Sequence, residues 1–123
     1  FGNLRIQPFG ERAIKDFVRT SAEEALKTEN AASRLVDNAR KVALLHYAPI
    51  RETLAGESPE LFPFLGSSLL ADAMDRQRVD VIFHGHAHHG SPVGRTAGGI
   101  PVYNVARKVL FTHHKKHYFV IDV

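Results

Sequence analysis

Residues 84 to 90 read HGHAHHG, so four histidines fall within six positions. The apolar run VDVIF, residues 79 to 83, stands directly before them and is typical of a buried strand. Imidazole nitrogens bind transition metals, and they also take up and release protons near neutral pH. The cluster therefore indicates a metal site or a proton-handling site, with a solvated loop as the alternative.

Another histidine follows a second strand-like run, KVALLHYAP, in which His46 closes the apolar stretch. If the two strands are parallel neighbours, His46 reaches the carboxyl edge that also carries His86 and His88, where α/β sheets bind ligands. Residues two apart on an extended backbone project to the same side, so His86 and His88 are expected to converge. Gly85 is expected to let the backbone turn close to a bound group. Three imidazoles at one edge favour zinc, iron or manganese.

A helix is predicted before the first strand. Apolar residues recur at spacings of three and four over residues 10 to 39, which indicates one long helix or two abutting helices. Ser21 and Glu24 form a capping-box pattern, which would place the break between two such helices. Residues 50 to 66 have no clear period and are expected to form a loop.

The rest of the chain continues the sheet. A helix is predicted from Ser67 or Ser68 to about Arg78. Its inward residues are expected to be Leu69, Leu70, Ala73 and Met74. Later elements are expected to be a strand at 79–85, a glycine-rich turn at 90–99, a strand at 100–106 and a hairpin at 107–123. Two apolar strands separated by a helix predict a parallel βαβ crossover and a sheet covered on both faces.

The composition fits one domain over residues 1 to 123. The chain has no cysteine, which excludes disulfides and thiol catalysis and fits a reducing compartment, so we expect a cytoplasmic location. No apolar run reaches the length of a membrane span, so no membrane partner is expected. The net charge of +3 comes without an aromatic-rich nucleic-acid motif, which argues against a nucleic-acid partner. The basic excess is partly gathered in Arg107, Lys108, Lys115 and Lys116.

At the histidine motifs the chain resembles the calcineurin-like metallophosphoesterase superfamily. GHAH, residues 85 to 88, matches the family's last signature motif, Gly-His-x-His. LLHYAP, residues 44 to 49, matches the preceding motif, a strand that ends in a ligand histidine with proline close behind. VYNVA, residues 102 to 106, fits the strand that commonly follows. The resemblance covers residues 41 to 106, and the ordered pair of motifs is more specific than either one.

The resemblance implies the C-terminal half of a four-layer αββα sandwich of the α/β (α+β) class, with a mixed sheet flanked by helices. It implies hydrolysis of phosphate mono- or diesters by a dinuclear metal centre containing manganese, iron or zinc. His46 and His86 would bind one metal ion, and His88 would bind the other. Such a metal pair polarises the phosphoryl oxygens and lowers the pKa of a bridging water.

Other residues near the motifs are weaker candidates. Arg51 is close enough in sequence to His46 to reach a phosphate, and His89 is a candidate for a substrate-facing or supporting position. Asn104 is expected to support the motif loop through a hydrogen bond. His84 is expected to be a strand residue rather than a ligand. Solvated positions are expected for His113, His114 and His117.

The family's earlier motifs, Asp-x-His, Gly-Asp and Gly-Asn-His-Asp/Glu, have no match in the chain. In the family these motifs supply the bridging aspartate, an asparagine ligand and a histidine that assists the leaving group, and they would lie before Phe1. We therefore expect the chain alone to contain no complete catalytic set, to bind metal weakly and to lack turnover. The apolar face left uncovered should pair with the missing half or drive self-association.

Two other interpretations stay open. The first is a noncatalytic protein that uses the metallophosphoesterase fold as a binding scaffold. The second is a metallo-β-lactamase-like hydrolase, because residues 84 to 89 are similar to the His-x-His-x-Asp-His motif of those enzymes. In that scheme His88 stands where the aspartate belongs, and His46 has no role.

Overall fold

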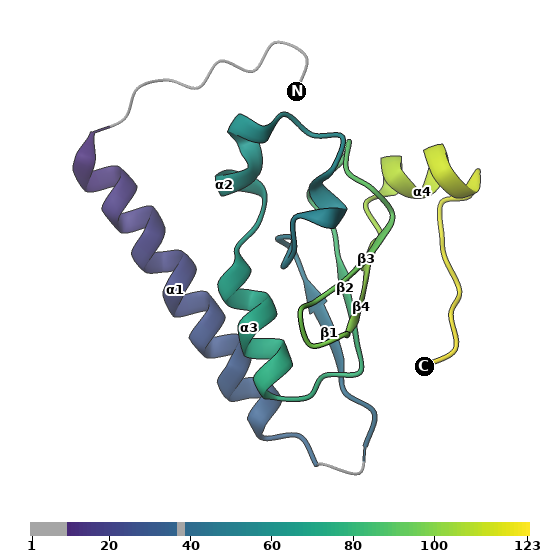
Figure 1. Ribbon diagram of the computed structural model, residues 1–123, viewed down its shortest axis with the longest axis horizontal. Coiled ribbons are helices and arrows are strands. Elements are labelled where there is room, and N and C mark those ends of the chain that lie inside the picture. The colour runs from purple at the N-terminus through teal and green to yellow at the C-terminus, as the bar shows by residue number, and fades with distance from the viewer. Residues whose placement is uncertain (1–9, 37–38) are drawn as a thin grey trace.

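The computed structural model describes residues 10–36 and 39–123, which form a mixed α/β structure (Figure 1). The elements in chain order are α1 (Glu11–Ser33), β1 (Val42–Leu45), the 3₁₀ turns η1 (Glu52–Leu54) and η2 (Pro59–Leu61), α2 (Phe62–Leu65), α3 (Ser68–Arg76), β2 (Val81–His84), β3 (Val93–Arg95), β4 (Pro101–Asn104) and α4 (Arg107–His114). Over the described residues, no helix combines the length and the apolar character needed to cross a membrane.

The four strands form one mixed sheet in the order β1-β2-β4-β3. β1, β2 and β4 are parallel, and β3 runs antiparallel to β4. The predicted crossover is confirmed, because α3 connects the parallel neighbours β1 and β2. Leu45 pairs with His84, and His84 pairs with Asn104, so all three parallel strands end level with one another. The loops that follow them therefore start from the same edge of the sheet.

One face of the sheet is covered by α1 and α3, which lie side by side in Figure 1. The core between these helices and the sheet contains Met74 from α3, Ile82 from β2 and Val102 from β4, all fully buried. Leu70, Ala73 and Met74 face inward as predicted, but Leu69 is 45% exposed. Leu69 lies about 100° around the helix from Leu70, outside the face that Leu70, Ala73 and Met74 bury.

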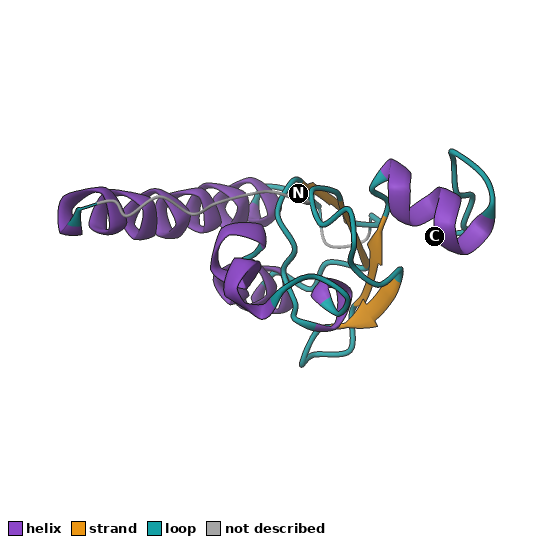
Figure 2. Cartoon of the chain, turned by 90° about the horizontal axis from the view of Figure 1, so that it is seen from above, coloured by secondary structure: helices purple, strands orange, loops and turns teal. Residues whose placement is uncertain are grey.

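The N-terminal helix is continuous through Ser21 and Glu24, so the predicted break is absent there. It ends at Ser33 rather than near residue 39, because the N–H groups of Arg34 and Leu35 close the last turn on the carbonyls of Ala31 and Ala32, respectively. Leu35 and Val36 then lie exposed in the turn that follows. Figure 2 shows that the N-terminal part of α1 extends beyond the rest of the molecule, which agrees with its mostly exposed side chains.

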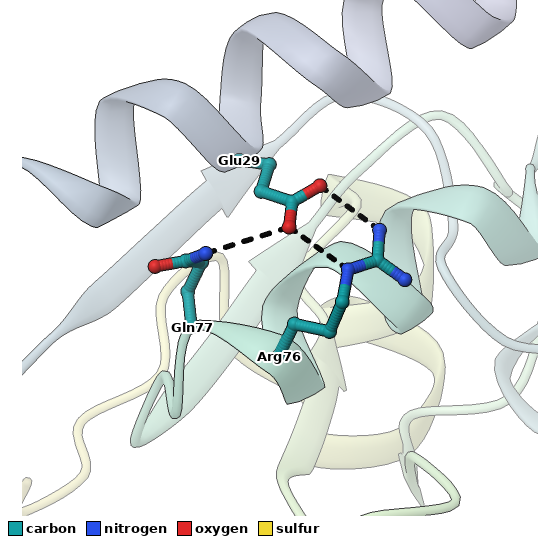
Figure 3. Close-up of polar contacts among 3 residues, drawn as sticks. All are labelled: Glu29, Arg76 and Gln77. Carbon is teal, nitrogen blue, oxygen red and sulfur yellow. Dashed lines mark hydrogen bonds and ion pairs between the residues drawn. The ribbon is translucent and has the colours of Figure 1, made fainter.

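A carboxylate on α1 holds the helix against α3 (Figure 3). The Arg76 guanidinium donates two hydrogen bonds to Glu29, from Nε to Oε1 at 2.8 Å and from Nη2 to Oε2 at 2.9 Å. Gln77 Nε2 donates a third bond to Glu29 Oε1 at 3.4 Å. The hydrogen bonds from Arg76 are the largest reason why the pKa of Glu29 falls to about 2. Glu29 is therefore ionised at neutral pH and fixes the C-terminal part of α1 on α3.

The opposite face of the sheet is not covered in the same way, which corrects the expectation of a sheet buried on both faces. Val42 and Leu44 on β1 are exposed, Leu44 to 80%. On the neighbouring strands Phe83 stacks on Tyr103, with ring centroids 5.7 Å apart, and Phe119 packs against Tyr103 at 5.4 Å. In both ribbon views α4 lies on the other side of the sheet from α1 and α3. We call the surface at Val42 and Leu44 the open face.

The predicted hairpin at residues 107–123 is wrong. Residues 107–114 form α4, whose Val109 and Leu110 are buried and whose last turn ends at Lys115 in a left-handed conformation with φ 57°. Residues 117–123, HYFVIDV, are mostly apolar and β-branched or aromatic, as a strand would be, but they pair with no strand among the described residues. A strand needs a partner for its backbone hydrogen bonds, so the pattern alone does not form one.

Two further expectations need correction. The glycine-rich segment 90–99 is not only a turn, because it contains β3, which adds an antiparallel edge to the sheet. Residues 50–66 contain η1, η2 and α2 rather than an open loop. Leu54 and Leu65 in this segment are buried and form a second apolar cluster with Ala48 and Ala87. The segment therefore packs against the residues that follow β1 and β2.

Candidate metal centre

The parallel crossover brings His46 and His86 together. His46 follows β1 directly and is exposed, and His86 follows β2 and is half-buried. The centroids of their imidazole rings are 4.7 Å apart. The ring of Tyr47 contacts both imidazoles edge-on, at 5.3 Å from His46 and 5.1 Å from His86. Two imidazoles and an aromatic ring thus form a compact cluster at the carboxyl edge of the sheet.

The backbone after β2 is turned rather than extended. The N–H of Ala87 donates to the carbonyl of Gly85 at 2.7 Å, and the N–H of His88 donates to the carbonyl of His86 at 2.9 Å. These bonds close two successive three-residue turns. The expected extended backbone through His86 and His88 is therefore wrong.

His86, not Gly85, has the unusual conformation in this loop. Its φ is +65°, in the left-handed region that non-glycine residues rarely adopt. Gly85 is not among the residues with positive φ, and a Cβ there would meet nothing within 4 Å. The predicted conformational role of Gly85 is therefore wrong. A left-handed histidine costs about 1–3 kcal/mol and persists only where surrounding contacts impose it, which is common at functional sites.

Asn104 supplies part of that constraint. Its side chain is buried, and Nδ2 donates to the carbonyl of Ala87 at 2.9 Å and to that of Thr53 at 3.4 Å. Its Oδ1 accepts the N–H of Ala106 at 3.1 Å. The hydrogen bond from Asn104 to the motif loop, expected from the sequence, is thus confirmed. One side chain at the end of β4 joins the histidine loop, η1 and the start of α4.

Replacing Asn104 with alanine is expected to lower the free energy of unfolding by about 1–3 kcal/mol, because buried backbone groups lose their partners. Urea denaturation followed by circular dichroism measures the change. Asn30→Ala is the matched control, because Asn30 is exposed on α1. Equal stability losses in the two variants would contradict the role given to Asn104.

His84 is a structural residue, as expected for a strand position. It is fully buried, with Nδ1 donating to the carbonyl of Gly85 at 2.8 Å and Nε2 accepting from the hydroxyl of Thr53 at 2.7 Å. A carbonyl can only accept, which assigns the ring proton to Nδ1. Burial lowers the pKa of His84 to about 4, so the ring is neutral at pH 7.

His86 has the protonation state that a metal ligand needs. Its Nε2 lies 3.3 Å from the carbonyl of Phe64, so Nε2 donates and Nδ1 carries the lone pair. Burial is the largest cause that lowers its pKa, and the nearby His46 and His88 lower it further. Metal-binding histidines commonly donate their second ring nitrogen to a carbonyl in this way.

The remaining candidates lie around this pair. His88 is exposed on the same loop. Arg51 is exposed and lines a cavity of about 450 Å³ that neither His46 nor His86 lines. His89 is exposed, and its Nε2 lies 3.4 Å from Nζ of Lys108 on α4. The structure therefore joins His46 to His86.

Sequence reasoning missed Glu57 and Thr53. Glu57 is buried, and its Oε1 accepts the backbone N–H of His89 at 2.7 Å. Gly56 has φ +112°, and a side chain there would collide with the carbonyl of His89. The glycine beside Glu57 was the only sequence sign of this close approach. The absence of a period in residues 50–66 concealed both contacts.

Within residues 10–36 and 39–123, no three His, Cys, Asp or Glu side chains are placed so that they could hold a metal ion. The assignment of His46, His86 and His88 as ligands, and of Arg51, His89 and Asn104 as residues that bind substrate or support the site, therefore stays a prediction. Comparisons with protein-family models, curated proteins and solved structures find no match. Any function must be inferred from the residues and their geometry.

Proposed function

We propose that the chain carries part of a dinuclear metal centre that hydrolyses phosphate esters, with His46 and His86 as ligands to one metal ion. The observation that carries the proposal is the pair of imidazoles 4.7 Å apart at the ends of adjacent parallel strands. These are the two histidines that match the ordered metallophosphoesterase motifs. A neutral His86 with its lone pair on Nδ1 supports ligation over a merely structural role.

The contrast with His84 strengthens this interpretation. A structural histidine in this fold is buried, with both ring nitrogens hydrogen-bonded within the protein. His46 is exposed, and His86 is half-buried. Strained backbone at His86 also fits a site whose geometry serves binding rather than packing.

The chain's own residues would bind the metal ions and orient the ligand side chains. His46 and His86 would hold one metal ion, and His88 the second, as the resemblance implies. Tyr47 contacts both imidazoles and restricts their ring orientations, while Asn104 holds the loop that carries His86. Bound divalent ions would polarise the phosphoryl oxygens and activate water for attack on phosphorus.

Carboxylate ligands would come from a segment outside these residues. A hydrolytic centre of this kind needs anionic ligands, and the described acidic side chain that interacts with His86 is Glu57. The open face, with Leu44 at 80% exposure, supports docking of a further polypeptide segment or self-association. By itself the chain is expected to show no turnover.

The test uses the polypeptide encoded by the same reading frame, including any residues before Phe1. Hydrolysis of p-nitrophenyl phosphate with added Mn²⁺ is expected, and His86→Ala should lower kcat/KM more than about 100-fold, beyond the loss typical of a supporting residue. His113→Ala on α4 is the matched control. Full activity in His86→Ala, or no metal-dependent hydrolysis in the wild type, would sink the proposal.

The alternatives make different predictions. A metallo-β-lactamase-like scheme needs His84 as a ligand, but hydrogen bonds within the protein occupy both of its ring nitrogens, so this scheme loses support. A binding scaffold draws support from the open face. It predicts a partner complex without hydrolysis in the same assay.

A further inference from the structure

A lysine from α4 reaches the loop that carries the candidate ligands. Lys108 lies in the first turn of α4, and its Nζ is 3.4 Å from Nε2 of His89. His89 directly follows His88. The C-terminal helix α4 lies on the side of the sheet away from α1 and α3 (Figure 1), and its Lys108 places an ammonium group beside the histidine loop.

Among the residues that the structure describes, the positive charge of Lys108 has no close counterion. Across the described part of the chain, no carboxylate lies within ion-pair distance of its ammonium group. The neighbouring Arg107 donates from Nε to Nδ1 of His117 instead of to an acid. Glu57 is the nearby buried carboxylate, and its Oε1 already accepts the N–H of His89.

The side chains of Lys108 and His89 together offer hydrogen-bond donors rather than acceptors. An ammonium can only donate, so Nε2 of His89 accepts from Lys108 and the proton of the neutral ring lies on Nδ1. The backbone of His89 is held by the bond to Glu57 and by the close approach of Gly56. A donor-only pair on an anchored loop is chemically suited to an oxyanion, and lysine binds phosphate as a point charge.

We propose that Lys108 and His89 form a phosphate subsite, on the loop that carries the candidate metal ligands, that selects substrates with an anionic phosphate group. This inference rests on the proposed phosphoesterase function and assigns Lys108 as a specificity-determining residue. The subsite favours phosphomonoesters and compounds with a second phosphate over neutral or singly charged esters, because the uncompensated ammonium gains most from added negative charge.

Inorganic phosphate is the probe, titrated into the isotopically labelled 123-residue chain by NMR at constant ionic strength with EDTA present. Saturable shifts are expected for the resonances of Lys108 and His89. Lys108→Gln should weaken phosphate binding about tenfold, as expected for loss of a charged hydrogen bond. Lys108→Arg should retain binding, because it keeps the charge.

Lys115→Gln is the matched control, since Lys115 closes the same helix and its Nζ donates to the carbonyl of Thr112. It should leave phosphate affinity unchanged. Wild-type affinity in Lys108→Gln, or equal losses in both glutamine variants, would overturn the subsite in favour of diffuse attraction to a basic surface.

The experiment separates this inference from the function it rests on. Phosphate binding is measured without metal, whereas the proposed function is tested by metal-dependent hydrolysis. Metal-dependent hydrolysis, combined with phosphate binding that does not depend on Lys108, would refute the subsite but not the phosphoesterase function. Phosphate binding that depends on Lys108, without hydrolysis, would support the subsite and refute the enzyme.

Discussion

Replacing His86 with alanine is expected to weaken Zn²⁺ binding by this chain at least about tenfold, because loss of a ligand should exceed the smallest losses seen for supporting residues. The wild-type chain should itself bind weakly, since the site has two close imidazoles and the described residues place no group of three possible ligands around an ion. Binding should also weaken below neutral pH, because a protonated imidazole has no lone pair for the metal. Isothermal titration calorimetry with Zn²⁺ measures both effects.

Two variants sharpen that experiment. His46→Ala should weaken Zn²⁺ binding as strongly as His86→Ala, because the two rings form one pair. His113→Ala should have no effect, because His113 is exposed on α4 and outside the pair. If the His86→Ala chain bound zinc with wild-type affinity, the pair would not be a metal site, and the cluster with Tyr47 would be only a packing arrangement.

Acidification from pH 7.5 to pH 4 is expected to lower the free energy of unfolding by about 3 kcal/mol through His84 alone. Burial lowers the pKa of this ring to about 4 in the folded state. An unfolded histidine titrates near its ordinary pKa of about 6.5. Between these values the unfolded chain binds more protons than the folded one, so stability falls as the pH falls. The contribution is fully present above the unfolded pKa.

Urea denaturation at a series of pH values measures this dependence. His84→Gln should be less stable at pH 7.5 and should flatten the curve between pH 7.5 and pH 4. His86, whose pKa is also lowered, should leave a smaller residual slope of the same sign. Glu29 has its pKa lowered to about 2, so its contribution is lost mainly below this window. An unchanged slope in His84→Gln would show that His84 is not the group responsible.

His113→Gln provides the matched control for this measurement, because His113 is exposed. Its pH dependence should match that of the wild type.

The sequence predicted the β1-α3-β2 unit and the proximity of His46 to His86. Periodicity distinguishes a helix from the two apolar strands around it, and a crossover that contains a helix makes such strands parallel neighbours. Parallel neighbours end at one edge, so histidines that directly follow them must lie close together. Asn104 was predictable for the same reason, since β4 joins that edge beside β2.

The conformation of the histidine loop was not predictable in this way. Histidines at alternate positions indicate an extended backbone. Hydrogen bonds within the loop and from Asn104 instead turn the backbone and hold His86 at positive φ. Glu57 reaches this loop from a segment with no periodic pattern. Such contacts join residues distant in sequence, and no local period encodes them.

The C-terminal residues 107–123 also separate what the sequence determined from what the tertiary structure decided. By itself the sequence determined which segments are apolar and the crossover that joins His46 to His86. Only the tertiary structure decided that residues 107–114 form a helix carrying Lys108 to His89 and that residues 117–123 pair with no described strand. The physical reason is that a helix satisfies its backbone hydrogen bonds within one segment, whereas a strand requires a partner that its own residues do not specify.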